Sequence, residues 1–178
     1  MKLTHREIPV ELLRKLPAGI KIVNRGGEEF LVIEDVRCSQ GHSLAVDSVR
    51  IHGEPSIKLH VKVKEDEGSI FVDAFWGSHA KLFSFLPSEV SGNIIVEASC
   101  PTCGESLMEK RECVLDDCES TDSILLRLPN GRDEIHVCGR LGCPGHEIKL
   151  AELPAHVSNV VSEINFFGAR FDEMFGDI

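Results

Sequence analysis

The chain has 178 residues, enough for one compact domain or for two small domains that share an interface. Hydrophobic residues make up 42% of it, which supports a buried core, whereas aromatic residues are only 6% and tyrosine is absent, which is sparse for a protein-interaction hot spot or a base-stacking platform. Acidic residues outnumber basic residues by 29 to 19, and the net charge of −10 disfavours binding to nucleic acid.

The first expected elements are a short helix and a pair of strands. Residues 9–16 are predicted to be helical, because a proline occupies the first turn and apolar residues follow at helical spacing. Residues 20–23 and 30–33 are predicted to be strands, since they flank the sequence Asn-Arg-Gly-Gly, which favours a turn.

A second antiparallel pair is expected farther along the chain. Residues 56–64 form the clearest strand, because every second residue from 57 to 63 is apolar and the residues between them are polar. Its partner is predicted at residues 69–75. Residues 82–86 are apolar and fit either a strand or a helix.

After residue 94, short strands alternate with cysteine pairs. Strands at 123–128 and 134–137 flank Pro-Asn-Gly-Arg, and Asn-Gly is a strong hairpin signal. Beyond Pro154, apolar residues follow steps of three and four, which predicts an amphipathic helix of ~20 residues; they are Val157, Val160, Val161, Ile164, Phe167, Phe171, Met174 and Phe175.

These elements predict a mainly β protein with short helices. Residues 1–92 form an N-terminal antiparallel β region that begins with a short helix, residues 93–152 form a cysteine-rich region, and residues 153–178 form the C-terminal amphipathic helix. No stretch approaches the ~18 apolar residues that a membrane helix needs, and the first six residues lack the apolar run of a secretory signal. We therefore expect a cytoplasmic protein without membrane contact.

In such a reducing compartment, the seven cysteines are expected to be metal ligands rather than disulfides. Zinc takes four ligands in a tetrahedron, and two ligands in one tight turn can supply half of it. Seven cysteines and one histidine would complete two sites, so we expect two Zn²⁺ per chain. The paired candidates are Cys38 with His42, Cys100 with Cys103, Cys113 with Cys118, and Cys138 with Cys143, the last pair followed by His146.

The sequence Cys-Pro-Thr-Cys-Gly at residues 100–104 resembles the zinc knuckle of zinc-ribbon proteins and rubredoxins. The resemblance covers these five residues strictly and residues 94–150 more loosely, as knuckle, strand pair and knuckle. In those families the proline and glycine shape a turn whose backbone N–H groups point at the sulfurs. The resemblance implies a zinc-ribbon-like C-terminal region, and it indicates a structural class rather than a function.

Two partitions of the ligands remain open. In the favoured one, the two pairs that flank the 123–137 hairpin form one site: Cys113, Cys118, Cys138 and Cys143. The other site joins the N-terminal pair to the knuckle: Cys38, His42, Cys100 and Cys103. In the rival, the knuckle closes locally with Cys113 and Cys118, since a short loop costs less entropy. Cys138, Cys143 and His146 would then seek Cys38 or His42, and His146 could replace Cys143 in either scheme. Buried free cysteines are the simpler alternative, above all for Cys38.

The sequence contains no phosphate-binding glycine loop, no His-Glu-x-x-His and no Gly-x-Ser-x-Gly. Ser78 beside His79 is a weak catalytic signal, because adjacent residues seldom hydrogen-bond as nucleophile and base. The ligands suffice to close both sites, so we expect a zinc-binding scaffold or adaptor whose protein partner binds the C-terminal helix or a sheet surface. That helix is also a candidate for homo-oligomer contacts.

Two alternatives belong to other functional classes. A four-cysteine site can hold iron, which would make the chain a rubredoxin-like electron carrier or redox sensor. If Cys38 does not bind, His42, Cys100 and Cys103 would leave an open position where zinc could activate water for hydrolysis.

Overall fold

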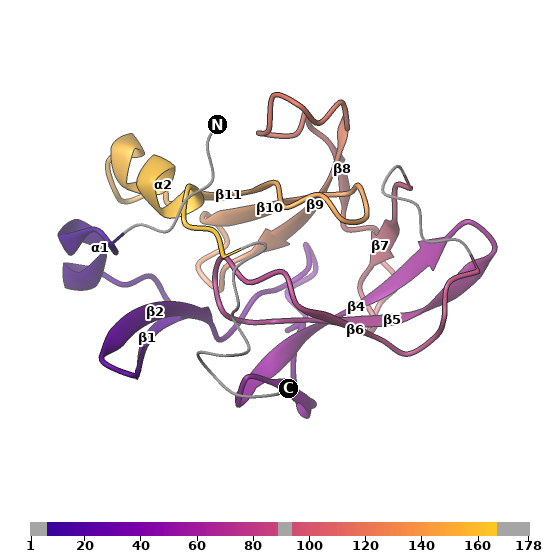
Figure 1. Ribbon diagram of the computed structural model, residues 1–178, viewed down its shortest axis with the longest axis horizontal. Coiled ribbons are helices and arrows are strands. Elements are labelled where there is room, and N and C mark those ends of the chain that lie inside the picture. Colours follow the sequence, from indigo (N-terminus) through magenta and orange to yellow (C-terminus); the bar gives the residue numbers. More distant parts are fainter. Residues whose placement is uncertain (1–6, 89–93, 167–178) are drawn as a thin grey trace.

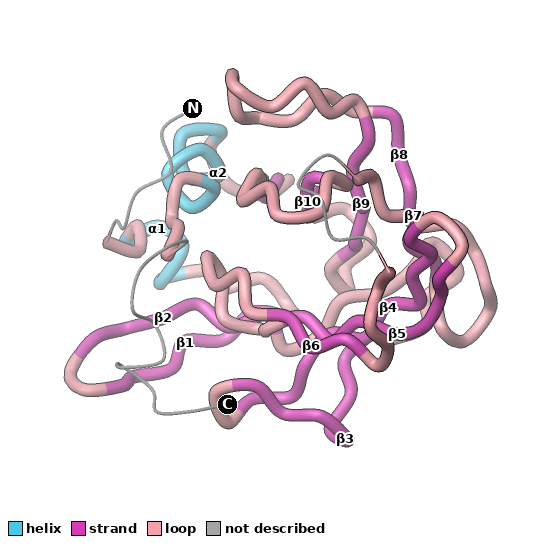
Figure 2. Tube along the Cα trace, turned by 45° about the vertical axis from the view of Figure 1, so that its right-hand side comes forward, coloured by secondary structure: helices cyan, strands magenta, loops and turns pink. Residues whose placement is uncertain are grey.

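The computed structural model describes residues 7–88 and 94–166. Over these ranges the chain is mainly β, with antiparallel sheets and two short helices, which confirms the expected class (Figure 1). Figure 2 shows the helices together on one side of the molecule and the strands over the rest. Neither helix is long and apolar enough to cross a bilayer.

The N-terminal part contains helix α1 (Val10–Arg14) and a hairpin of β1 (Ile20–Arg25) with β2 (Glu28–Ile33). All three predicted elements are confirmed. The strands extend beyond the predicted limits because the turn is tighter than expected: Gly26 and Gly27 alone occupy it, with φ of 60° and 89°. Such angles suit glycine, which has no Cβ.

A five-stranded sheet follows, with strand order β3-β4-β5-β6 and β7 beside β4. The predicted strand of residues 56–64 is confirmed as β4, and its apolar residues, including Leu59 and Val61, are buried. The partner strand begins earlier than expected because the turn contains only Lys64 and Glu65. The strands are β3 (Ala45–Ile51), β4 (Glu54–Val63), β5 (Asp66–Val72), β6 (Lys81–Phe83) and β7 (Glu97–Ser99).

The cysteine-rich region forms a four-stranded sheet with strand order β11-β10-β9-β8. The predicted hairpin is confirmed as β9 and β10, whose turn contains Gly131 with φ of 71°. The strands are β8 (Met108–Lys110), β9 (Asp122–Arg127), β10 (Glu134–Cys138) and β11 (His146–Lys149).

The two larger sheets face each other, with β4 to β6 on one side and β9 to β11 on the other in Figure 1. One hydrophobic core runs between them and draws residues from all three regions predicted from the sequence. Leu59 comes from the first region, Leu126 from the second and Val161 from the third, and each is at most 5% exposed. Residues 89–93, at the boundary between the first two regions, lie outside the described residues.

The C-terminal helix is shorter than the sequence pattern indicates. Helix α2 runs from Ala155 to Ser162, so the prediction of a helix of ~20 residues is wrong at residues 163–166, and residues 167–178 lie outside the described part. The helix ends because the chain turns back to the β structure. The backbone N–H of Phe166 donates to the Gly77 carbonyl at 2.8 Å, and the Phe166 ring packs 5.7 Å from that of Phe30.

Helix α2 also covers the free edge of β11. The backbone N–H groups of Ile148 and Leu150 donate to the hydroxyls of Ser162 and Ser158, at 2.9 and 3.0 Å. These serines are four residues apart and therefore share one helix face. The contacts satisfy strand groups that an open edge would leave unpaired.

Candidate metal centres

The first centre, site A, begins in the loop between β2 and β3. Cys38 and His42 lie in a tight turn, since the Gly41 N–H donates to the Cys38 carbonyl at 3.0 Å and the Cys38 N–H donates to the His42 carbonyl at 3.1 Å. Gly41 adopts a φ of 86° there. Arg37, just before this turn, pairs its backbone with Arg127 of β9, so the turn is held against the second sheet.

The other half of site A is the segment between β7 and β8 that contains Cys100 and Cys103. Its turn closes through the Gly104 N–H, which donates to the Cys100 carbonyl at 2.9 Å, and Gly104 has a φ of 72°. The Cys100 N–H donates to the Glu105 carbonyl at 2.8 Å. These two bonds fix both thiols on one side of the turn.

The four side chains of site A meet at one point. Their ligand atoms all lie within 4.8 Å of one another. Cys38 Sγ is 3.9 Å from Cys103 Sγ and 3.5 Å from His42 Nδ1. A tetrahedral zinc with bonds of about 2.3 Å to sulfur and about 2.0 Å to nitrogen would hold two sulfurs about 3.8 Å apart and a sulfur and a nitrogen about 3.5 Å apart. The site therefore has the dimensions of a metal tetrahedron.

The second centre, site B, is built from the β8–β9 loop and the end of β10. Cys113 and Cys118 are held by backbone bonds inside their loop: the Cys113 N–H donates to Ser120 and the Cys118 N–H to Leu115. Cys138 ends β10, and Cys143 follows in the turn that leads to β11. The Cys138 N–H donates to the Gly145 carbonyl at 2.8 Å and closes that turn.

Site B has the same dimensions. Its four sulfurs also lie within 4.8 Å of one another, with 3.7 Å between Cys113 and Cys143 and 3.8 Å between Cys118 and Cys138. A disulfide would need about 2.05 Å, and all seven cysteines are free thiols. Gly145 leaves room for this cluster, because a Cβ at that position would stand 2.5 Å from the Cys113 sulfur.

Backbone N–H groups surround the sulfurs. Six of the seven cysteines receive a hydrogen bond from the residue two positions later, which the structure places at Thr102, Glu105, Leu115, Ser120, Arg140 and Gly145. A hydrogen bond to sulfur favours the charged thiolate over the neutral thiol. Thiolate is the form that binds metal, so the turns are preorganised for ligation.

Without a cation, the thiols of site B oppose one another's ionisation. Burial raises the pKa of Cys118, but the Ser120 N–H, the neighbouring thiols and Arg140 outweigh it and bring the pKa to about 7. Burial raises the pKa of Cys113 to about 11 and that of Cys143 well above its ordinary range. One thiolate therefore suppresses the others, and a divalent ion at the centre would remove the conflict.

Two basic side chains face the sulfurs of site B, where four thiolates around a divalent ion would leave a double negative charge. Arg140 donates from Nη1 to the Cys118 sulfur at 3.9 Å. Burial lowers the pKa of the Lys81 ammonium, and negative charge at Cys143 and Cys138 opposes that shift. No local motif in the sequence indicates either residue.

The structure thus gathers the ligands as in the favoured partition and not as in the rival local one. His146 lies outside both centres. Its Nε2 is 2.8 Å from the Ile164 carbonyl and its Nδ1 3.1 Å from the Pro144 carbonyl, because the residue faces the core beside α2. His79 and Ser78 do not form a catalytic pair: the Ser78 hydroxyl donates to Asp73 instead, at 2.5 Å.

No family model, no curated protein and no solved structure matches this chain. The chemistry of the two centres therefore carries the functional argument.

Proposed function

We propose that this protein is a zinc-binding scaffold that holds one structural Zn²⁺ in site A and another in site B. The observation that carries the proposal is the meeting of eight donors in two groups of four, at the spacing of a metal tetrahedron. Every cysteine of the chain takes part. A set of merely buried thiols would have no reason to converge in this way.

Zinc fits the donor sets better than iron does. Site A combines three sulfurs with one imidazole nitrogen, a set typical of structural zinc, whereas a rubredoxin iron takes four sulfurs. Site B, with four sulfurs, suits either metal. Zinc–thiolate protein is colourless and ferric rubredoxin is red, so the absorption spectrum of the purified protein separates the two.

A structural role is favoured over hydrolysis because both sites are closed. A catalytic zinc keeps one position for water beside three protein ligands. The hydrolase alternative requires Cys38 to stay out of site A, but Cys38 lies within 3.5 Å of His42 and is buried. Four donors therefore stand around each centre.

The two ions would stabilise different connections of the fold. Site A ties the loop after β2 to the turn after β7, two segments about sixty residues apart in the sequence. Site B ties the β8–β9 loop to the β10–β11 turn. Cross-links that close long loops limit the entropy of the unfolded chain. Zinc would therefore fix each pair of loops to one another.

Metal analysis of the purified protein tests the proposal. We expect two zinc equivalents in the wild type, one in His42→Gln, which lacks a site A ligand, and one in Cys113→Ser, which lacks a site B ligand. His146→Gln is the matched control and should keep two. A folded wild type without zinc, or equal zinc in all four proteins, would refute the proposal.

Self-association through the C-terminal residues needs a separate test, and α2 itself cannot be removed for it because the helix is part of the core. Val157 and Val161 are fully buried, so removing the helix would unfold the protein. A chain that ends at residue 166 keeps α2 and removes the phenylalanine-rich segment at 167–178. Light scattering should find self-association in the full chain and a zinc-loaded monomer in the shortened one. Equal masses would exclude homo-oligomer contacts through this segment.

A further inference from the structure

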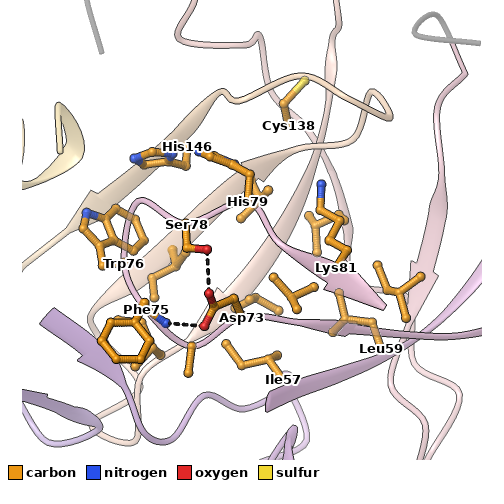
Figure 3. A pocket seen from close by; sticks show the side chains of 18 of the residues that line it. Ile57, Leu59, Asp73, Phe75, Trp76, Ser78, His79, Lys81, Cys138 and His146 are labelled. Carbon is orange, nitrogen blue, oxygen red and sulfur yellow. Dashed lines mark hydrogen bonds between the residues drawn. The ribbon is translucent and has the colours of Figure 1, made fainter. Parts of the chain in front are cut away.

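A cavity lies between the two facing sheets and reaches site B at one end, where Cys138 lines it. It has a volume of about 90 Å³, and apolar side chains form most of its wall. Figure 3 shows it from close by, with Ile57 and Leu59 along its floor and polar residues at its upper end. Protein interiors are close-packed and leave few voids larger than a water molecule. A space of this size is therefore a candidate binding site; its wall includes Leu59, Ile70, Val72, Leu126, Ile135 and Val137.

The ionisable groups at the polar end of the cavity already have partners inside the protein. The Asp73 carboxylate accepts a hydrogen bond from the Ser78 hydroxyl at 2.5 Å and lies 2.7 Å from Nδ1 of the buried His52. Lys81 faces the sulfurs of site B, and in Figure 3 its amino group points away from Asp73 and toward them. Arg140 donates to a sulfur of the same site. The charges at this end are therefore matched within the protein, and they select neither an anion nor a cation.

The other polar side chains of the wall are engaged in the same way. Nε1 of Trp76 donates to the Val161 carbonyl at 2.7 Å. Both ring nitrogens of His146 lie within 3.1 Å of backbone carbonyls, and Nε2 of His79 is 3.1 Å from Oδ1 of Asn165. Burial lowers the pKa of both imidazoles, to about 3 for His79, so neither adds positive charge at neutral pH. Within the described part of the chain, the wall thus offers little to ordered water, which needs about two to four polar partners.

We propose that the cavity binds a small, uncharged, hydrocarbon-like molecule between the two sheets. An ion would lose its hydration there and gain no partner in exchange, whereas an apolar molecule gains by leaving water. A dry apolar cavity of about 150 Å³ holds the six carbons of benzene, so about 90 Å³ accommodates about four carbons. Ser78 and His79 are only half-buried, so such a molecule has a short path in from solvent at the polar end. Butane is the matching probe.

Nuclear magnetic resonance of the zinc-loaded protein tests the proposal, with butane, butanoate and butylammonium as the probes. Butane should show intermolecular Overhauser effects to the methyl groups of Leu59, Val72 and Ile135, which line the cavity from both sheets. Its dissociation constant should be at least tenfold lower than that of either ion. A wild type that shows no contacts with butane, or an ion that binds as tightly as butane does, would overturn the proposal.

Two variants change the size of the cavity in opposite directions. Val72→Phe fills it from β5 and should weaken butane binding at least tenfold, whereas the matched control Val10→Phe, at an exposed position of α1, should bind butane as the wild type does. Ile70→Ala removes three carbons from the wall, so benzene, which is too large for the wild type, should bind to this variant. Butane binding that survives in Val72→Phe would overturn the proposal, and if that variant folds poorly, failure of Ile70→Ala to bind benzene would do so. Zinc analysis of each variant separates a loss of metal from a change in the cavity.

Discussion

The substitution Gly145→Ala is a sharp test of site B, because it crowds a sulfur without changing a ligand. The added Cβ would stand 2.5 Å from Cys113 Sγ, 3.4 Å from Cys143 Sγ and 3.5 Å from the Cβ of Cys138. Real Cβ atoms do not approach heavy atoms closer than 3.0 Å. The Cys113 sulfur must therefore move by at least 0.5 Å, the difference between these two values.

This displacement exceeds what a zinc site tolerates, since its bond lengths stay within about 0.2 Å of ideal values. Changes to residues that only support the ligands already weaken metal binding by about 10–100-fold. We therefore expect Gly145→Ala to weaken zinc at site B by about 100-fold and to leave site A unchanged. Competition with a chromophoric chelator measures both affinities in one titration.

Gly142→Ala is the matched control in the same turn. Its Cβ would meet nothing within 4 Å, but its φ of 82° is unfavourable for alanine. This variant should lose about 1 kcal/mol of stability through backbone strain and keep its zinc affinity. Two tightly bound zinc ions in Gly145→Ala would contradict the placement of the Cys113 sulfur beside Gly145 and its role as a zinc ligand.

Two further predictions concern the protein around the metals. Burial lowers the pKa of His79 from 6.5 to about 3, and the charges of His146 and Lys81 add to this shift. Because the native state then binds fewer protons than the unfolded state, the free energy of unfolding falls as the pH drops below 6.5. By pH 5 this loss is about 2 kcal/mol. The difference in the free energy of unfolding between wild type and His79→Gln, measured by urea unfolding with Trp76 fluorescence, should therefore change by that amount between pH 7.5 and pH 5. A difference that stays constant with pH would contradict the lowered pKa of His79. Ser162→Ala should lower the free energy of unfolding by about 1–3 kcal/mol, because the buried N–H of Ile148 loses its partner. The control, Ser48→Ala at an exposed position of β3, should change the free energy of unfolding by less than about 0.5 kcal/mol.

Local patterns in the sequence sufficed for β1, β2, β4, β5, β9 and β10 and favoured the observed ligand grouping, but they gave no range for β3, β7, β8 or β11. The alternation from residue 57 to residue 63 fixes which face of β4 is buried, and the Asn-Gly turn fixes the β9–β10 hairpin. The grouping of the cysteines followed from that hairpin, since its two ends bring the flanking cysteine pairs together. For this hairpin, residues that a local sequence pattern brings together are also neighbours in the structure.

The features that the sequence did not reveal depend on contacts between distant segments. The pattern of α2 continues beyond Ser162, but the pairing of Phe166 with Gly77 ends the helix. Likewise, Lys81 of β6 comes near the site B cysteines through the packing of one sheet on the other, although more than fifty residues separate it from Cys138 in the sequence. The pocket lined by Leu59 of β4 and Ile135 of β10 likewise depends on how the two sheets pack, and no single segment of the sequence encodes it.

The most direct test of the two-centre account is X-ray absorption at the zinc edge of the purified wild-type protein. Seven cysteines and one histidine shared by two ions predict, as an average per zinc, between three and four sulfur ligands at about 2.3 Å and fewer than one nitrogen ligand at about 2.0 Å. A first shell dominated by oxygen or nitrogen would contradict the account, as would protein that is folded and contains no zinc.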